Sequence, residues 1–238
     1  MAAADAILFD LDQTLLDGSA FQSSIVGTCE ALARLVPRLS AAELLRANTE
    51  VWQRYWVEIE RDWLLGNVSG AAVKKEAWRR TLQRVAAVDE NRLCRALDIH
   101  TELEWNSHRL FDDALGVVQG LRSAGLPVGL VTNGASDTQR DKLSAVHLEN
   151  AFDVVVVSAE IGAAKPEPLP FELAMARLSI SGPRVWHIGD SLESDVAGAR
   201  AAGITAVWLN RSGRRRLHRE PQPDAEIRSL LELPDLIR

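Results

Sequence analysis

Two carboxylates follow the first apolar run of the chain at a spacing of two. The run from Ala6 to Phe9 predicts a short buried strand, and Asp10 and Asp12 come directly after it. Side chains at positions i and i+2 of an extended chain lie on the same side, so these carboxylates can converge on one point past the strand end. Two anions at one point repel each other unless a cation or a proton lies between them. The pair therefore indicates a metal-assisted site.

Polar side chains also follow three later strand-like runs, each in a different part of the chain. They are Thr132, Asn133, Lys165, Asp190 and Asp195. Each alone is typical of a turn, a surface loop or a helix cap. Their occurrence together, each after its own strand, favours a single site at one edge of a sheet.

These runs belong to an alternation of strands and helices that begins near residue 110. Periodicity predicts helices over 115–124, 136–146, 171–178 and 192–202 and strands over 128–131, 154–157, 185–188 and 206–209. Together with the first strand, the sequence predicts five strands. Their alternation with helices indicates βαβ units and a parallel α/β sheet. Sheets of this kind bind ligands beyond the carboxyl ends of their strands, where the polar groups fall. A last segment, 224–237, is expected to form an amphipathic helix packed on the core.

Residues 17–108 have a different pattern, with helices expected near 19–36, 41–65, 70–87 and 89–107 and no convincing strand. We therefore expect one core domain formed by 1–16 and 109–238, with a helical domain of residues 17–108 inserted in it. One helix face carries Trp52, Trp56, Ile59 and Trp63. Two interpretations are open: the stripe is the packing face of the insertion, or one of its tryptophans walls a pocket and stacks on a planar ligand.

Other candidate groups have plainer interpretations. Lys74, Lys75, Arg79 and Arg80 are expected on a charged outer helix face rather than against an anionic substrate. His187 lies inside an apolar run and is expected to be a hydrogen-bonded core histidine. Neither group is therefore counted in the site.

The strand-end motifs resemble those of the haloacid dehalogenase superfamily, in the branch with a helical cap inserted after the first strand. The segment Asp10-Leu11-Asp12-Gln13-Thr14 is similar to its first motif, although many members carry glycine where Gln13 stands. Thr132 matches the second motif, Lys165 the third, and the run from Gly189 to Asp195 the acidic fourth. The resemblance implies a Rossmann-like α/β core with a five-stranded parallel sheet flanked by helices, plus an all-helical cap.

The resemblance also implies a role for each motif residue. Asp10 is the nucleophile that forms an aspartyl-phosphate, and Asp12 is the general acid and base. The phosphoryl oxygens are bound by Thr132, Lys165 and the backbone N–H groups of Leu11, Asp12 and Asn133. The metal is Mg²⁺, and its ligands are Asp10, the backbone carbonyl of Asp12, Asp190 and Asp195, the last through water or by orienting the others. A carboxylate with a pKa of about 3.9 is ionised at neutral pH and needs no base to act as a nucleophile.

Asp12 also bears on the class of reaction. Dehalogenases of this superfamily lack an acid at that position, because halide leaves without a proton, whereas an alcohol needs one. We therefore expect a phosphoric monoester hydrolase, a Mg²⁺-dependent phosphatase of a small phosphorylated metabolite. The spacing of Thr132-Asn133-Gly134 from Gln139 and Lys142 is similar to that in the nucleotidase and acylneuraminate-phosphate phosphatase branches. A phosphomutase using the same acids and a non-catalytic phosphate-binding or regulatory module are the alternatives.

Composition and charge limit the partners. The 238-residue chain has a net charge of −6, which argues against nucleic acid as a partner, because that binding depends on a basic surface. No apolar run has the roughly 20 residues of a membrane span, and the N-terminus does not resemble a signal peptide. Cys29 and Cys94 fit no metal-binding or disulfide pattern and are expected to be free thiols. We expect a cytoplasmic protein, monomeric or a small homo-oligomer, whose partner is a small phosphate ester.

Overall fold

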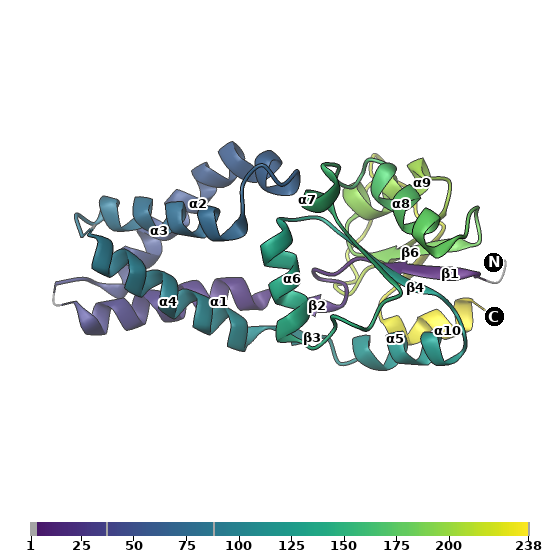
Figure 1. The fold of residues 1–238 in the computed structure, drawn as a ribbon, viewed down its shortest axis with the longest axis horizontal. Coiled ribbons are helices and arrows are strands. Elements are labelled where there is room, and N and C mark those ends of the chain that lie inside the picture. Colours follow the sequence, from purple (N-terminus) through teal and green to yellow (C-terminus); the bar gives the residue numbers. More distant parts are fainter. Residues whose placement is uncertain (1–3, 37, 88, 238) are drawn as a thin grey trace.

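The chain forms two bodies that lie end to end. A computed structural model describes residues 4–36, 38–87 and 89–237. Helices α1 to α4 form one body, which we call the helical body, and the remaining elements surround a β-sheet and form the sheet body (Figure 1). The helical body follows the first strand of the sheet in the chain, so the sheet body is built from both sides of it.

The sheet of the described residues is parallel throughout and has six strands in the order β5-β4-β1-β6-β7-β8. The strands are β1 (Ala6–Phe9), β4 (Val128–Thr132), β5 (Val154–Val157), β6 (Val185–Gly189), β7 (Thr205–Leu209) and β8 (Ala225–Ile227). β1 lies between β4 and β6, with Ile7 paired to Val128 on one side and to Trp186 on the other. The strand order reverses at β1, and such a switch point is where open parallel sheets bind ligands.

The α/β fold with a parallel sheet is confirmed, but the expected number of five strands is wrong. The sixth strand, β8, lies in the segment 224–237 that was expected to be one helix. Only η2 (Leu230–Glu232) and α10 (Leu233–Leu236) are helical there. Ala225 pairs with Val207, so β8 covers the edge of β7. Three residues are too few for an alternating pattern to be distinguished from a helical one.

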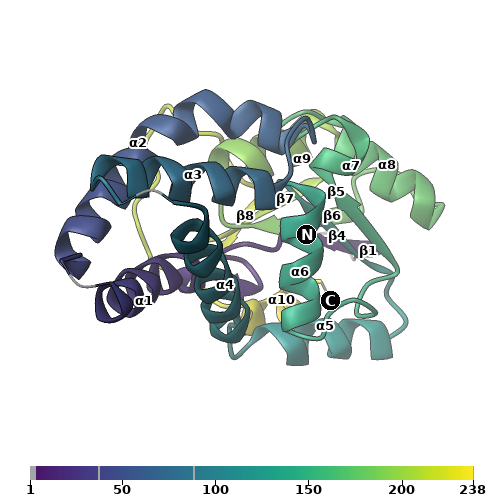
Figure 2. The same cartoon turned by 60° about the vertical axis from the view of Figure 1, so that its left-hand side comes forward.

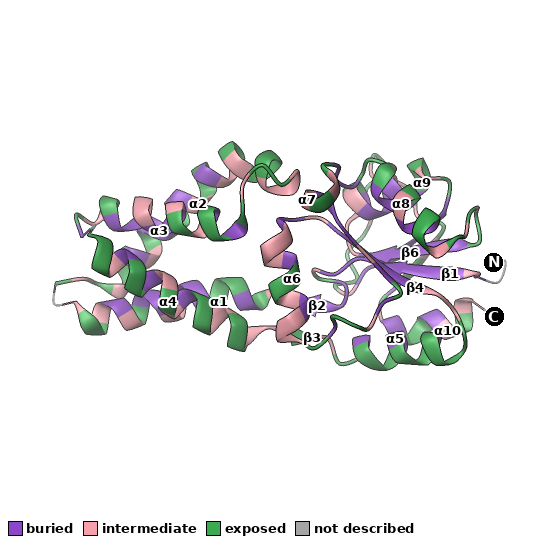
Figure 3. Cartoon of the chain, viewed as in Figure 1, coloured by how far each residue is buried: buried purple, intermediate pink, exposed green. Residues whose placement is uncertain are grey.

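Helices cover both faces of the sheet, as a parallel sheet requires. The helices of the sheet body are α5 (Ala114–Ser123), α6 (Ser136–Ala145), α7 (Ser158–Ile161), α8 (Leu169–Leu178) and α9 (Ala197–Ala201), the last preceded by the π-helical turn η1 (Leu192–Val196). In Figure 1, α8 and α9 lie on one face and α5 and α10 on the other. Each face has its own apolar cluster, and the strands between them are buried (Figure 3). Gly129 of β4 leaves room for side chains of the strands on either side of it, because a Cβ there would lie 2.7 Å from side-chain atoms of both Leu8 and Val154.

The helical body has its own apolar core. Its helices are α1 (Ser19–Leu35), α2 (Ala41–Leu64), α3 (Gly70–Arg84) and α4 (Glu90–Ser107). Side chains of Ser40, Ser69 and Asp89 cap the starts of the last three. α1 packs mainly against α4, and α2 against α3, which encloses two clusters separate from those of the sheet. Among the described residues, each helix is too short or too polar to cross a membrane.

The two bodies are joined by the chain and by direct contacts. A short antiparallel ribbon of β2 (Leu16–Asp17) and β3 (Arg109–Leu110) carries both chain crossings. The ribbon was not predicted, since two residues per strand leave no pattern in the sequence. α6 and α7 lie at the junction and contact α2, α3 and α4 (Figure 2). One of these contacts is a hydrogen bond of 2.7 Å from the Ser158 hydroxyl to the carbonyl of Leu64.

Candidate active site

Three carboxylates meet where β1 and β6 end. One oxygen atom from each of Asp10, Asp190 and Asp195 lies within 4.8 Å of the others. The pairing of Phe9 with Ile188 aligns the two strands, so that the residues following them come together. Asp195 folds back over the end of β6, and the position under it is Gly189, where a Cβ would lie 2.2 Å from the Asp195 carboxyl carbon. The acidic end of β6 thus requires glycine at that position.

Lys165 lies between two of these carboxylates. Its Nζ is 2.6 Å from Oδ1 of Asp10 and 2.7 Å from Oδ1 of Asp195, and it is 5% exposed. Asn133 positions the lysine: its amide donates to the Lys165 carbonyl, and its side-chain oxygen accepts from the Lys165 N–H, both at 2.9 Å. The end of β4 therefore holds the cation that faces the end of β1.

Burial makes the charges at this point strongly interdependent. Burial raises the pKa of Asp10 to about 8, against the opposing effect of Lys165. Burial and the charge of Asp195 raise the pKa of Asp190 to about 6. Burial works against the charge of Asp195 too, but Lys165 and His187 outweigh it and hold the pKa of Asp195 well below its ordinary value. Additional positive charge is needed here to keep all three carboxylates ionised.

The donor set fits a hard divalent cation. Carboxylate oxygens at this separation are the ligands that Mg²⁺ prefers, and a cation would relieve their repulsion. Asp195 already accepts hydrogen bonds from Lys165, from His187 Nε2 at 2.9 Å and from the Ser191 N–H at 3.0 Å. Asp10 and Asp190 are therefore better placed as direct ligands, with Asp195 holding the others in position.

Asp12 lies in a different environment from Asp10. Both of its carboxylate oxygens accept from Lys142 Nζ, at 2.8 and 2.9 Å, and Oδ2 also accepts from Gln139 Nε2 at 3.0 Å. The same Gln139 nitrogen donates to the hydroxyl of Thr132 at 2.5 Å. Burial opposes the charge of Asp12, but Lys142 and Gln139 lower its pKa below the ordinary value. Helix α6 thus links the carboxylate after β1 to the hydroxyl at the end of β4.

The structure divides the predicted site residues into two adjacent groups. Asp10, Lys165, Asp190 and Asp195 form the first, and Asp12 and Thr132, joined through Gln139, form the second. Leu11 lies between the two aspartates in the chain, and its fully buried side chain leaves only its backbone for the site.

Residues outside the predicted site complete it. Gln139 and Lys142 hold Asp12, although sequence reasoning assigned them no role. Their spacing of three puts both side chains on one face of a helix that begins soon after Thr132, and this spacing could have indicated their place at the site. His187 is buried with its ring 4.8 Å from that of Phe171, as expected for a core histidine, and it also binds Asp195.

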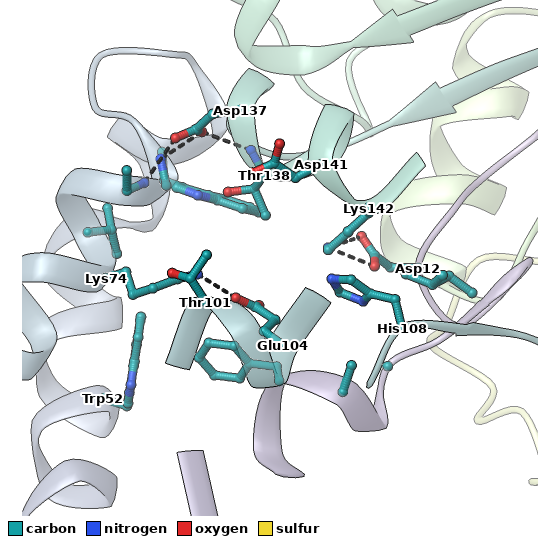
Figure 4. Close-up of a pocket in the computed structure, with 18 of the residues that line it drawn as sticks. Asp12, Trp52, Lys74, Thr101, Glu104, His108, Asp137, Thr138, Asp141 and Lys142 are labelled. Atoms are coloured by element: carbon teal, nitrogen blue, oxygen red, sulfur yellow. Dashed lines mark hydrogen bonds and ion pairs between the residues drawn. The ribbon is translucent and has the colours of Figure 1, made fainter. Parts of the chain in front are cut away.

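A pocket of about 830 Å³ lies between the helical body and the sheet body. Asp12, His108 and Lys142 lie on one side of it and Trp52 on the opposite side (Figure 4). Trp52, Trp56 and Trp63 all line it, and Trp52 and Trp63 also pack on the apolar clusters. The packing interpretation therefore holds for Trp52 and Trp63, and all three tryptophans wall the pocket, whereas stacking on a planar ligand stays a prediction.

The basic residues of α3 divide between the pocket and the outer surface. Lys74 lines the pocket and pairs with Glu104 at 2.5 Å, and Lys75 lines it too. Arg79 and Arg80 instead pair with Glu76 on the helix surface. The expectation of an outer charged face holds for the arginines and is wrong for Lys74.

The chain belongs to a known hydrolase family. The model of the haloacid dehalogenase-like hydrolases matches residues 4–203, which include every residue of the site described above. Fold and site thus agree with the resemblance seen in the motifs.

Characterised relatives of similar length are phosphatases. A phosphoserine phosphatase of Thermus thermophilus is 29% identical over 249 residues, covering 95% of this chain and 96% of the relative. A glyceraldehyde 3-phosphate phosphatase of Methanopyrus kandleri is 30% identical, covering 98% and 97%. The N-acylneuraminate-9-phosphatase of Mus musculus is 29% identical, covering 98% and 93%. The names of these relatives give different substrates, although their sequence identities to this chain are nearly equal.

Solved structures with this fold include two kinds of enzyme. An HAD phosphatase from Thermococcus onnurineus is 28% identical with a TM-score of 0.69, covering 98% of this chain and 97% of the other. A 2-haloacid dehalogenase from Pseudomonas syringae pv. Tomato DC3000 is 26% identical, also with a TM-score of 0.69, covering 100% and 98%. The fold alone therefore does not distinguish a phosphatase from a dehalogenase. The distinction has to come from the residues of the site.

Proposed function

We propose that this protein is a Mg²⁺-dependent phosphatase that hydrolyses a small phosphorylated metabolite through an aspartyl-phosphate. One observation carries the proposal: a second carboxylate, Asp12, stands two residues after Asp10 and faces the pocket, held by Lys142 and Gln139. A proton donor at this point serves an alcohol leaving group, whereas a halide needs none. The phosphatase names of the relatives support the same choice.

The reaction takes two steps at phosphorus. Asp10 Oδ2 attacks the phosphorus, the bond from phosphorus to the ester oxygen breaks, and Asp12 gives that oxygen a proton, which it has to carry at this point against the effect of Lys142 and Gln139 on its pKa. Water then attacks the same phosphorus, Asp12 takes a proton from it, and the bond from phosphorus to Asp10 breaks to release phosphate. Lys165, the Thr132 hydroxyl and the backbone N–H groups of Leu11, Asp12 and Asn133 stabilise the charge on the phosphoryl oxygens.

Mg²⁺ fits this scheme through Asp10, Asp190 and the backbone carbonyl of Asp12, with Asp195 orienting them. When bound, the cation would offset the repulsion between the carboxylates and an anionic phosphate. The positive charge of Lys165 also offsets this repulsion, and its hydrogen bonds hold Oδ1 of Asp10 and of Asp195.

We further propose that residues 17–108 act as a cap over the core formed by 1–16 and 109–238. The pocket lies between these parts, so closure of the cap would exclude water from the first step. The free Cys29 and Cys94 support a reducing compartment such as the cytoplasm.

The test is phosphate release from p-nitrophenyl phosphate with and without Mg²⁺. Asp10→Asn should lower kcat by at least about 10⁴-fold, because the variant lacks the nucleophile. Glu193→Gln, an exposed acid in the turn after β6, should retain the parent rate. Equal rates for Asp10→Asn and the parent would refute the assignment, and activity only with an added bisphosphate would indicate a phosphomutase.

A further inference from the structure

Four aromatic side chains form a continuous surface along one side of the pocket. We call Phe21, Trp52, Trp56 and Trp63 the aromatic wall. Their successive ring centroids are 5.2, 6.2 and 5.2 Å apart. Each ring contacts the next, so the aromatic surface continues without a break from Phe21 of α1 along α2 to Trp63. The wall is therefore a long surface rather than a small cage.

The aromatic wall reaches the chemical site at its Trp63 end. A Cβ on Gly134 would lie 2.6 Å from the Trp63 ring, so this ring packs directly on the backbone that follows Thr132 and Asn133. The glycine at position 134 thus leaves room for the wall next to the proposed phosphate site.

The pocket lies on the side of the site where the leaving group departs. Asp12 and Lys142 are among the described residues that line it, whereas Asp10 and Lys165 are not. Asp12 is the residue placed to protonate the ester oxygen, so the alcohol attached to that oxygen extends into the pocket and not toward Lys165. Across the open space from Asp12 stands Trp52 (Figure 4).

The charges of the pocket disfavour an anionic group on the leaving alcohol, because the acids of the described lining, which include Asp17 and Asp141, outnumber its lysines. Lys74 is paired with Glu104, and Lys142 with Asp12. Asp137 is bound by the N–H groups at the start of α3. A second phosphate would find only Lys75, which lies 4.0 Å from Glu90, among the remaining cations of the described lining.

We infer that the substrate is the phosphate monoester of an alcohol whose planar ring system carries no negative charge and stacks on the aromatic wall. The inference rests on the proposed function and specifies its substrate class. A volume of about 830 Å³ accommodates such a leaving group, whereas a three-carbon alcohol would touch little of a wall this long. The paired Lys74 and Glu104 can exchange hydrogen bonds with hydroxyl or amide groups on the ring system.

Three phosphate esters separate the possibilities: 1-naphthyl phosphate, glycerol 3-phosphate and phosphocholine. Because 1-naphthol is a better leaving group than an alkyl alcohol, the support for the wall is the effect of Trp52→Ala and not a preference of the parent for 1-naphthyl phosphate. Trp52→Ala should lower kcat/KM for 1-naphthyl phosphate about tenfold and leave kcat/KM for glycerol 3-phosphate within twofold, because only the ring uses the wall. Trp52→Phe should recover most of the loss. Trp105→Ala, at an exposed tryptophan of α4 outside this pocket, is the matched control and should behave as the parent.

Several results would overturn the inference. They are an equal loss for both esters in Trp52→Ala, a parent preference for glycerol 3-phosphate, or a preference for phosphocholine, which would assign the wall to a cation instead. Calorimetric binding of 1-naphthyl phosphate to Asp10→Asn with Mg²⁺, repeated with the Trp52→Ala change added, tests the wall without turnover. Absence of phosphate release from all three esters would contradict the proposed phosphatase function, while the calorimetric comparison would still decide whether the wall binds a ring.

Discussion

At the scale of single residues, the two aspartates of the first motif differ because their neighbours differ. Asp10 is buried against Lys165, which holds one of its oxygens at 2.6 Å. Asp12 is less buried, and Lys142 and Gln139 bind it from the pocket side. Burial raises the pKa of Asp10 and Lys142 lowers that of Asp12, so the proposed roles of nucleophile and proton carrier require a cation beside Asp10 and a proton on Asp12. The proposed roles of the two aspartates therefore depend on the contacts that α6 makes with Asp12 as well as on the first motif.

His100 carries a pH dependence that belongs to folding rather than to catalysis. It is fully buried in the helical body, where its Nδ1 accepts a hydrogen bond of 2.6 Å from Trp78 Nε1. Burial lowers the pKa of His100 from 6.5 to about 4, although Glu104 opposes the shift. Between these pH values the unfolded chain binds a proton that the folded chain does not. Stability must therefore fall as the pH is lowered through this range.

We expect His100 to remove about 2 kcal/mol from the free energy of unfolding between pH 7.5 and pH 5. Urea unfolding of the parent and of His100→Gln at both pH values measures it, since the variant should lose that part of the dependence. His218→Gln, at an exposed histidine, should keep the parent's dependence. An identical pH dependence in His100→Gln and the parent would contradict the assignment.

The sequence predicted the charged residues of the candidate site, but it did not predict that Lys142 and Gln139 bind Asp12. Asp10, Lys165, Asp190 and Asp195 were predicted because each follows a strand, and parallel strands end at one edge. Lys142 instead acts from the second turn of a helix, where a lysine is usually solvated. Its contact with Asp12 joins residues 130 apart and depends on how α6 packs.

At the scale of elements, the start of α3 is seated on the start of α6. Asp137 accepts from the N–H groups of Gly70 and Ala71 at 2.8 and 2.9 Å, so a carboxylate of the sheet body caps a helix of the helical body. Gly70 is required at this contact, since a Cβ there would lie 1.8 Å from the Thr138 hydroxyl. The contact closes one side of the pocket.

Removing this contact should weaken closure of the pocket. Asp137→Ala loses hydrogen bonds from two N–H groups to a charged acceptor, which we expect to lower kcat/KM for p-nitrophenyl phosphate about tenfold. The global free energy of unfolding should change less, because the cores of both bodies are untouched. Asp98→Ala, at an exposed acid of α4, is the control for lost charge. An unchanged kcat/KM in Asp137→Ala would show that the contact does not govern closure.

Elements were predictable where they repeat a period for long enough. The helices α1 to α4 begin and end within a few residues of their expected limits, because each has several turns and three have capping side chains. β2, β3 and β8 were missed, since two or three residues do not show a period. These short strands form through pairing with partners that the sequence alone does not place.

At the scale of the whole molecule, the groups proposed for the reaction and those proposed to bind the leaving group come from different bodies. The proposed reacting groups lie at the ends of β1, β4 and β6 and in the loop that carries Lys165, and the apolar surface of the pocket comes mainly from α1 and α2. The solved phosphatase and dehalogenase structures match nearly the whole chain, so both bodies occur in both kinds of enzyme. Differences in the helical body can change the substrate without moving the nucleophile.

The acidic cluster links cation binding to the stability of the molecule as a whole. Asp10, Asp190 and Asp195 repel one another, in a chain that already has a net charge of −6. A cation that binds only the folded state stabilises it by about 2.7 kcal/mol at a hundred times its Kd. For a chain of this length that corresponds to a rise in Tm of about 5–10 °C.

We therefore expect MgCl₂ to raise the Tm of the parent by this amount, and EDTA to reverse the rise. Asp190→Asn should abolish most of the rise, because it removes a proposed direct ligand, and Glu193→Gln in the same turn should keep it. Sodium chloride at equal ionic strength measures the part due to screening of the net charge, which every variant should share. A rise of equal size in Asp190→Asn and the parent would mean that Mg²⁺ acts on the general acidity of the chain and not at the ends of β1 and β6.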